Sequence, residues 1–105
     1  MYSIGLAMKL RPGCYEEYKD AHDNLWPELA KGMRENEISM AIYRSGDTLF
    51  IHAVAPSEQA WNNGRNDPVL DKWHEYMVKL LEANDKGEID FTQLEPAFEF
   101  GMFKG

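Results

Sequence analysis

Aromatic residues and a histidine recur at helical spacing in the first third of the sequence. Tyr18, His22 and Trp26 lie four residues apart, so a helix would stack their side chains on one face. Imidazole titrates near neutral pH and can donate or accept a proton, whereas phenol and indole offer hydrogen bonds from apolar rings. Trp73 and His74 lie on a later stretch with its own apolar period. Together these side chains suit a pocket for a neutral polyol in which one group moves protons.

Each of these side chains also has a structural interpretation. A buried histidine such as His22 is often hydrogen-bonded to a backbone carbonyl, and tryptophans more often fill core volume than bind ligands. Burying two histidines in so short a chain costs solvation without apolar gain, which favours a pocket for the group as a whole. For His74 both interpretations stay open, and His52 can equally face solvent or a subunit contact. Charged residues beside the first stripe predict a solvated face: Glu16, Lys19, Asp20 and Asp23.

Other chemistries find little support in the sequence. No serine lies in a nucleophile elbow, and Cys14 lies beside a turn without an assigned histidine partner. The sequence contains no H-E-x-x-H motif, no cysteine cluster and no glycine-rich phosphate loop. Asp71 and His74 have helical spacing but nothing to complete a metal site. We therefore expect no metal ion.

Length and charge narrow the class of protein. The 105 residues predict one domain spanning residues 1–105. A formal charge of −7 and a pI near 4.8 have the wrong sign for nucleic acid or an anionic membrane. The single Cys14 and the lack of a signal peptide or membrane-spanning run predict a cytoplasmic protein.

Periodicity predicts the elements that position these residues. Residues 2–10 alternate large apolar with small residues, which is typical of a strand. An amphipathic helix follows from Cys14 to about Glu35, with a kink or restart near residues 23–26 because Pro27 cannot donate a helical hydrogen bond. Residues 38–43 and 48–54 predict two antiparallel strands joined by a short hairpin loop.

The second half of the chain repeats this scheme. A helical region opens at Pro56 and Ser57, is interrupted at residues 62–66, restarts with Asp67 as a cap followed by Pro68, and runs to about Ala83. The apolar run from Ala97 to Phe103 predicts the fourth strand.

The order β-α-β-β-α-β predicts an α+β fold of the ferredoxin-like type, with a four-stranded antiparallel sheet and both helices on one face. Both inward helical stripes then direct His22 and His74 into the space between helices and sheet. The other sheet face needs a cover, so we expect a homodimer in which two sheets pack together as a dimeric α+β barrel.

The motif residues also resemble a known family. The run E-E-Y-x-x-x-H-x-x-x-W-P-E-L over residues 16–29, followed by A-I-Y at 41–43, L-F at 49–50, W-N at 61–62 and W-x-x-Y-M at 73–77, resembles the L-rhamnose mutarotase family. The resemblance covers nearly the whole chain in the same order. It implies a dimer without a cofactor that interconverts the α and β anomers of a 6-deoxy-L-hexose. It also implies that His22 is the proton donor and that Tyr18 binds the sugar.

Two positions depart from the family pattern. Met40 stands where the rhamnose enzymes carry a second sugar-binding tyrosine, and His74 replaces the second of two adjacent tryptophans. Both changes fall in the expected sugar-contacting shell, so the reaction is expected to persist while the preferred sugar can shift from L-rhamnose towards L-fucose.

The predicted mechanism is acid-base opening of the sugar ring. His22 supplies a proton to the ring oxygen, Tyr18 orients the sugar and Trp73 covers an apolar sugar face, while His74, Tyr43 or a water acts as the complementary base. Two alternatives belong to other classes: a small monooxygenase or haem-handling protein of the same architecture, and a sugar-binding module without turnover.

Overall fold

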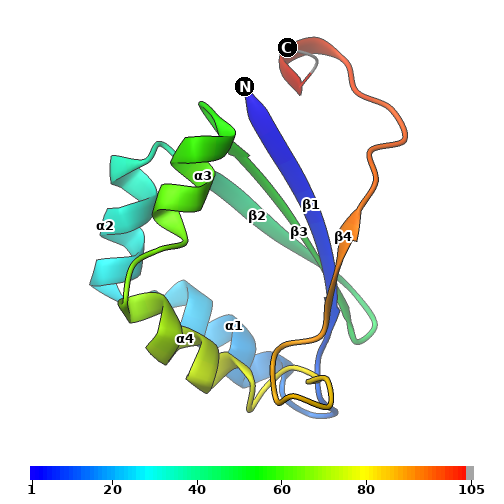
Figure 1. Ribbon diagram of the computed structural model, residues 1–105. Helices are drawn as coiled ribbons and strands as arrows, with labels where there is room; N and C mark the ends of the chain where they lie inside the picture. The colour runs from blue at the N-terminus through cyan, green and yellow to red at the C-terminus, as the bar shows by residue number, and fades with distance from the viewer. Residues whose placement is uncertain (104–105) are drawn as a thin grey trace.

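The computed structural model describes residues 1–103 as a four-stranded antiparallel sheet with helices packed against one face (Figure 1). The strands are β1 (Tyr2–Lys9), β2 (Ser39–Ser45), β3 (Thr48–Ala55) and β4 (Phe91–Leu94), in the order β2-β3-β1-β4. The helices are α1 (Tyr15–Asp23), α2 (Pro27–Glu35), α3 (Glu58–Gly64) and α4 (Val69–Met77). The predicted α+β class and ferredoxin-like strand arrangement are confirmed. No helix within residues 1–103 is long and apolar enough to cross a bilayer.

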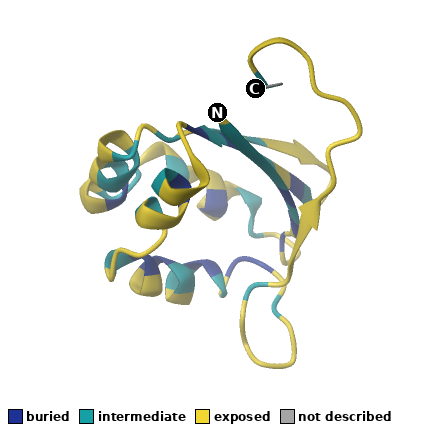
Figure 2. Cartoon of the chain, turned by 45° about the horizontal axis from the view of Figure 1, so that its top comes forward, coloured by how far each residue is buried: buried dark blue, intermediate teal, exposed yellow. Residues whose placement is uncertain are grey.

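Strand alternation divides the sheet into two different faces. In the register of β1 with β3, Met8 pairs with Leu49 and Ala7 pairs with Phe50. Met8 and Leu49 are buried beneath the helices, whereas Phe50 remains 39% exposed on the other face. Large apolar residues therefore make the core on the helical side, and no helix within the described chain covers the second face, which only the C-terminal residues touch (Figure 2).

The predicted first helix is two helices, as Pro27 requires. The α1 helix ends at Asp23, where the backbone and side-chain N–H groups of Asn24 both donate to the Asp20 carbonyl. Trp26 then adopts φ −57° and ψ 132°, an extended conformation that is typical of a residue before proline. Pro27 opens α2 at its first position, so the restart is confirmed.

A second corner separates α3 from α4. The side chain of Ser57 caps α3 by accepting from the backbone N–H of Ala60 at 3.1 Å. The interruption is shorter than the predicted residues 62–66, because α3 continues to Gly64. After it, the Asp67 carboxylate accepts from the Val69 N–H at 3.0 Å and starts α4 beside Pro68. The predicted opening of the helical region at Ser57 and the predicted capping role of Asp67 are confirmed.

The α4 helix is shorter than the sequence predicts. It ends at Met77 and not near Ala83, because the chain turns to place Leu81 in a bridge with Leu10 at the end of β1. The Leu80 carbonyl accepts from the Arg11 N–H at 2.9 Å, which fixes this turn. Leu80 and Leu81 are buried there at 3% and 2% exposure. They fit the apolar period because they belong to the core, although they lie beyond the end of the helix.

The fourth strand also lies elsewhere than predicted. A bridge between Ala83 and Ile89 returns the chain so that Phe91 pairs with Met8, and β4 therefore precedes the predicted run. Residues 97–103 leave the sheet and include a 3-10 turn at Gly101–Phe103. The prediction of a strand over Ala97 to Phe103 is wrong, because that run has no strand neighbour within the subunit (Figure 1).

Candidate functional site

A cavity of about 620 Å³ lies between the helices and the sheet. Its walls come from α1, α2, β2, β3, the corner between α3 and α4, and α4. The volume falls within the range typical of small-molecule sites. All six predicted site residues border it: Tyr18, His22, Met40, Tyr43, Trp73 and His74.

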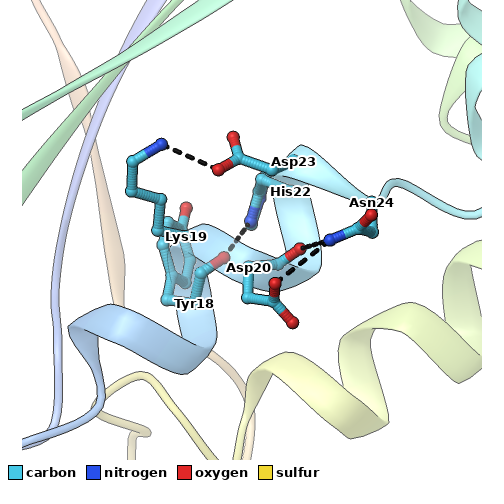
Figure 3. Close-up of polar contacts among 6 residues, drawn as sticks. All are labelled: Tyr18, Lys19, Asp20, His22, Asp23 and Asn24. Carbon is cyan, nitrogen blue, oxygen red and sulfur yellow. Dashed lines mark hydrogen bonds and ion pairs between the residues drawn. The ribbon is translucent and has the colours of Figure 1, made fainter.

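His22 is held in one orientation by its own helix. Its Nδ1 lies 2.8 Å from the Tyr18 carbonyl oxygen, one helical turn earlier (Figure 3). A carbonyl oxygen only accepts, so Nδ1 carries the hydrogen and donates it. In the neutral ring this leaves Nε2 with its lone pair. Burial lowers the pKa of His22 below its ordinary value of 6.5, against the opposing effects of the Tyr18 hydrogen bond and of Asp23, so the neutral form predominates at pH 7.

Tyr18 and Trp73 enclose the imidazole. The ring centroids of Tyr18 and His22 are 4.2 Å apart, and the Trp73 ring meets His22 edge-on at 5.2 Å. Tyr18 is 5% exposed, and desolvation raises the pKa of its phenol to about 12. The phenol therefore stays protonated at neutral pH and can act as a hydrogen-bond donor or acceptor.

Trp26 supports this cluster from behind and does not border the cavity. Its ring meets Trp73 edge-on at 5.0 Å and stacks on Tyr76 at 6.3 Å. The spacing of Tyr18, His22 and Trp26 therefore predicts a shared helical face correctly, but only Tyr18 and His22 reach the cavity. Trp26 holds the Trp73 ring in place.

The two positions that depart from the family pattern also border the cavity. Met40 on β2 is half-buried and packs against the cluster of Ala53, Ala55 and Trp61. His74 on α4 is half-buried. Desolvation and then the nearby Arg65 charge lower the pKa of His74, whereas Asp71 raises it.

Tyr43 stands apart from the other predicted site residues. Tyr43 borders the cavity, but strand alternation directs its side chain to the other sheet face, where it pairs with Phe50. The side chain is 66% exposed there. Its predicted role at the sugar therefore has no support within one subunit and stays a prediction.

Six charged residues border the cavity, and none of them was predicted as a site residue: Lys19, Asp23, Glu28, Arg44, Arg65 and Asp67. Lys19 and Asp23 border it, although the helical wheel predicts a solvated face for both. They form an exposed ion pair of 2.8 Å, so they lie at the rim and remain in water (Figure 3). Arg65 follows α3 and also borders the cavity. No period or motif marks Arg65 in the sequence, because the corner between two helices has no repeat.

The cavity combines one fixed imidazole, one protonated phenol, aromatic walls and a few charged donors and acceptors. Such a site can bind a small hydroxylated molecule, and its imidazole can exchange a proton with it at neutral pH. Within residues 1–103, no three His, Cys, Asp or Glu side chains are grouped to hold a metal ion.

Comparison with known proteins gives a consistent result. The sequence profile of L-rhamnose mutarotase matches residues 3–100. The L-rhamnose mutarotase of Burkholderia orbicola is 34% identical over 101 residues, covering 93% of this chain and 97% of that protein. The Escherichia coli L-rhamnose mutarotase is 30% identical with the same coverage.

Solved structures agree with the sequence comparison. The crystal structure of L-rhamnose mutarotase from Formosa agariphila superposes with a TM-score of 0.79 at 27% identity, covering 96% of this chain and all of that one. A putative antibiotic biosynthesis monooxygenase from Nitrosomonas europaea has a TM-score of 0.65 at 10% identity over 93% of this chain and 100% of that one, which shows a shared fold only. The chain belongs to the L-rhamnose mutarotase family.

Proposed function

We propose that this protein is an isomerase that interconverts the α and β anomers of a 6-deoxy-L-hexose by acid-base ring opening, with L-rhamnose as the first candidate sugar and L-fucose as the second. The observation that carries the proposal is His22, which is fixed through Nδ1 between Tyr18 and Trp73 beside the cavity. Family membership supports the reaction type and the sugar class.

A single imidazole can serve both oxygens of the anomeric carbon. Neutral Nε2 of His22 accepts the O1 proton while the C1–O5 bond breaks and C1 becomes an aldehyde carbon. The imidazolium then gives that proton to O5. Rotation about C1–C2 and the reverse steps close the ring as the other anomer. His22 is thus the proton donor to O5 in this proposal, and it first takes the proton from O1.

The aromatic walls have separate roles in this mechanism. The protonated Tyr18 hydroxyl binds and orients the sugar, and the Trp73 ring covers an apolar sugar face. No external proton source is consumed, because the proton taken from O1 returns to O5. The partly buried Cys14 takes no part, and as the only cysteine it fits the reducing cytoplasm that we propose as its compartment.

We also propose that the working unit is a homodimer. One sheet face is uncovered and displays Tyr43, Phe50 and Leu94 at 66%, 39% and 40% exposure. We name these three residues together with His52 the bare sheet face. Residues 95–103, which we name the C-terminal arm, leave Phe98 and Phe100 at 81% and 75% exposure. A second copy would cover apolar surface of this extent.

The test of the proposed function is NMR exchange between anomers, measured on L-rhamnose and L-fucose with wild-type protein and with His22→Asn. Wild-type protein should accelerate exchange of at least one sugar, and His22→Asn should lower the catalysed rate by about 10²-fold or more. Glu16→Gln is the matched control, because Glu16 lies on the same helix, is exposed and does not border the cavity.

The same experiment separates the alternatives. Sugar binding without accelerated exchange would identify a binding module and contradict an enzyme. Full activity in His22→Asn with an unchanged circular dichroism spectrum would remove His22 from the mechanism. Haem or flavin absorption bands in the purified protein would favour the monooxygenase or haem-handling alternative.

A further inference from the structure

Arg65 lies at the corner between α3 and α4 and turns back over the protein. Its guanidinium lies 5.3 Å from the centre of the Trp61 ring, and the residue borders the cavity. Trp61 is itself buried at 7% exposure. The indole therefore supports the guanidinium at one end of the cavity, although the Arg65 residue as a whole keeps contact with solvent.

The Arg65 guanidinium has no acceptor within residues 1–103. The ion pairs there join Lys19 to Asp23 and Lys31 to Glu35, and the hydrogen bonds of the described side chains do not include the Arg65 guanidinium. Desolvation lowers the pKa of Arg65, yet a guanidinium stays protonated in proteins. Because Arg65 is exposed, water can meet its five donors, and a ligand oxygen that replaces this water breaks no hydrogen bond or ion pair within residues 1–103.

His74 lies close enough to Arg65 to feel its charge. Desolvation, and after it the Arg65 charge, lower the pKa of His74, which keeps the imidazole neutral at pH 7. A neutral imidazole offers one donor and one acceptor, whereas the guanidinium offers donors only. This end of the cavity can therefore bind a hydroxyl group, which itself donates and accepts.

The charges around the cavity favour a neutral ligand over an anion. Three basic side chains and three acidic side chains border it, so their formal charges cancel: Lys19, Arg44 and Arg65 against Asp23, Glu28 and Asp67. The nearest acidic residue in sequence, Asp67, already accepts the Val69 N–H. An anionic ligand would meet no net positive charge in such a cavity.

We propose that Arg65 is a specificity-determining residue, whose guanidinium donates to two adjacent hydroxyls of the sugar. This inference rests on the proposed function and names the group that distinguishes one sugar from another. Met40 provides no hydroxyl donor on the β2 side of the cavity. The sugar hydroxyls are therefore bound by Arg65 and His74, on the side of α3 and α4. The planar guanidinium matches two neighbouring oxygens at a fixed spacing, and a sugar with one hydroxyl inverted fits it less well.

The test compares Arg65→Gln and Arg65→Lys with wild-type protein in anomer-exchange NMR on L-rhamnose and L-fucose. For the preferred sugar, Arg65→Gln should raise the half-saturation concentration about tenfold or more with little change in the saturated rate. The preference between the two sugars should become smaller in the same variant. Arg65→Lys should restore only part of the affinity and part of the preference, because an ammonium lacks the planar fork of donors. Arg34→Gln is the matched control, since Arg34 is exposed and does not border the cavity.

Monodeoxy analogues of the preferred sugar locate the contact. Removing a hydroxyl that Arg65 binds should weaken sugar binding by wild-type protein and leave sugar binding by Arg65→Gln unchanged. An equal loss of affinity for both sugars in Arg65→Gln would overturn the proposal. A lowered saturated rate with an unchanged half-saturation concentration would also overturn it. Tighter binding of L-galacturonate than of L-fucose, which differ only by a carboxylate at C6, would also overturn it in favour of an anion site.

The proposed function can fail independently of this assignment. If wild-type protein accelerates no sugar, saturation-transfer NMR on the same sugars measures binding alone. Binding that weakens in Arg65→Gln but not in Arg34→Gln would support Arg65 as the reader of a bound sugar. Equal binding in both variants would overturn the assignment.

Discussion

At the scale of single residues, the hydrogen bond between His22 and Tyr18 determines which form of the imidazole can work. Nδ1 is occupied by the Tyr18 carbonyl, so the exchanged proton must travel through Nε2. A neutral ring can take the O1 proton at once. An imidazolium must first lose a proton before it can act as that base. The two cases give opposite pH dependences.

We expect catalysed anomer exchange to be constant through neutral pH and to fall only in acid. The pKa of His22 lies below 6.5, chiefly because burial disfavours the charged ring. Above that pKa the ring is neutral and active, and protonation below it removes the base. NMR exchange rates from pH 8 down to about pH 4, corrected for the spontaneous rate in buffer, should therefore show a midpoint below 6.5.

The imidazole signals of His22 itself provide the control for this measurement. Their titration midpoint should coincide with that of the rate, and the acid limb should persist in His74→Gln, because His74 is the other histidine at the cavity. A catalysed rate that rises as the pH falls below 6.5 would contradict the neutral base and make the imidazolium the working form.

At the scale of the elements, the α3 and α4 corner shows how local caps position a binding residue. Ser57 starts α3 by accepting the Ala60 N–H, and Asp67 starts α4 by accepting the Val69 N–H. Arg65 lies in the few residues between these helices. Both caps therefore restrict where its backbone can lie, and Asp67 itself borders the cavity.

Removing the first cap should cost stability. We expect Ser57→Ala to lower the free energy of unfolding by about 1 kcal/mol and Tm by about 4 °C, because the Ala60 N–H loses its partner at the helix end. Chemical and thermal unfolding at one fixed protein concentration would measure both. Ser45→Ala, an exposed position in the hairpin, should change stability by less than about 0.5 kcal/mol. Equal stability of the two variants would show that the cap contributes nothing.

The elements also show which features local sequence can predict. Pro27 fixes the break between α1 and α2, and Ser57 and Asp67 fix helix starts, since each acts within a few residues. The predicted end of α4 was wrong, because a tertiary bridge between Leu81 and Leu10 stops the helix. The predicted position of the fourth strand was wrong for a similar reason, since Phe91 pairs with Met8 and the more apolar run that follows does not join the sheet.

The candidate site divides in the same way. His22 and Tyr18 could be predicted because a helix repeats its face every turn. Trp26 shares that face but lies behind Trp73, which only the packing of two helices decides. Arg65 follows no period, and its place at the cavity depends on the corner that carries it.

At the scale of the whole molecule, the isolated subunit is too open for its size. Its accessible surface is 7274 Å², whereas a monomeric protein of this mass has about 6,000 Å². The radius of gyration is 14.0 Å, against about 13 Å for a compact chain of this length. The excess surface is larger than the area of about 800 Å² that one partner buries in a standard interface.

The bare sheet face and the C-terminal arm account for this openness. Tyr43 and Phe50 pair across β2 and β3 on that face, and Phe103 of the arm returns to it, with its ring 5.1 Å from His52. Phe98 and Phe100 stack on each other but remain exposed, and the arm is coloured as exposed along most of its length (Figure 2). A second sheet laid on this face would bury these rings and place the partner's arm nearby.

We expect Phe50→Lys to convert the proposed dimer into a folded monomer. Phe50 contributes little to the core of its own subunit, since it points away from the helices, so the secondary structure should persist. A lysine at the centre of two packed sheets would bury a charge without a partner, which an interface of this size does not tolerate. Light scattering after size exclusion at micromolar concentration should give twice the mass of 12.1 kDa for wild-type protein and that mass itself for the variant. Gln59→Lys adds the same charge on exposed α3 and should stay dimeric. A monomeric wild-type protein, or a dimeric Phe50→Lys, would place the subunit contact elsewhere or remove it.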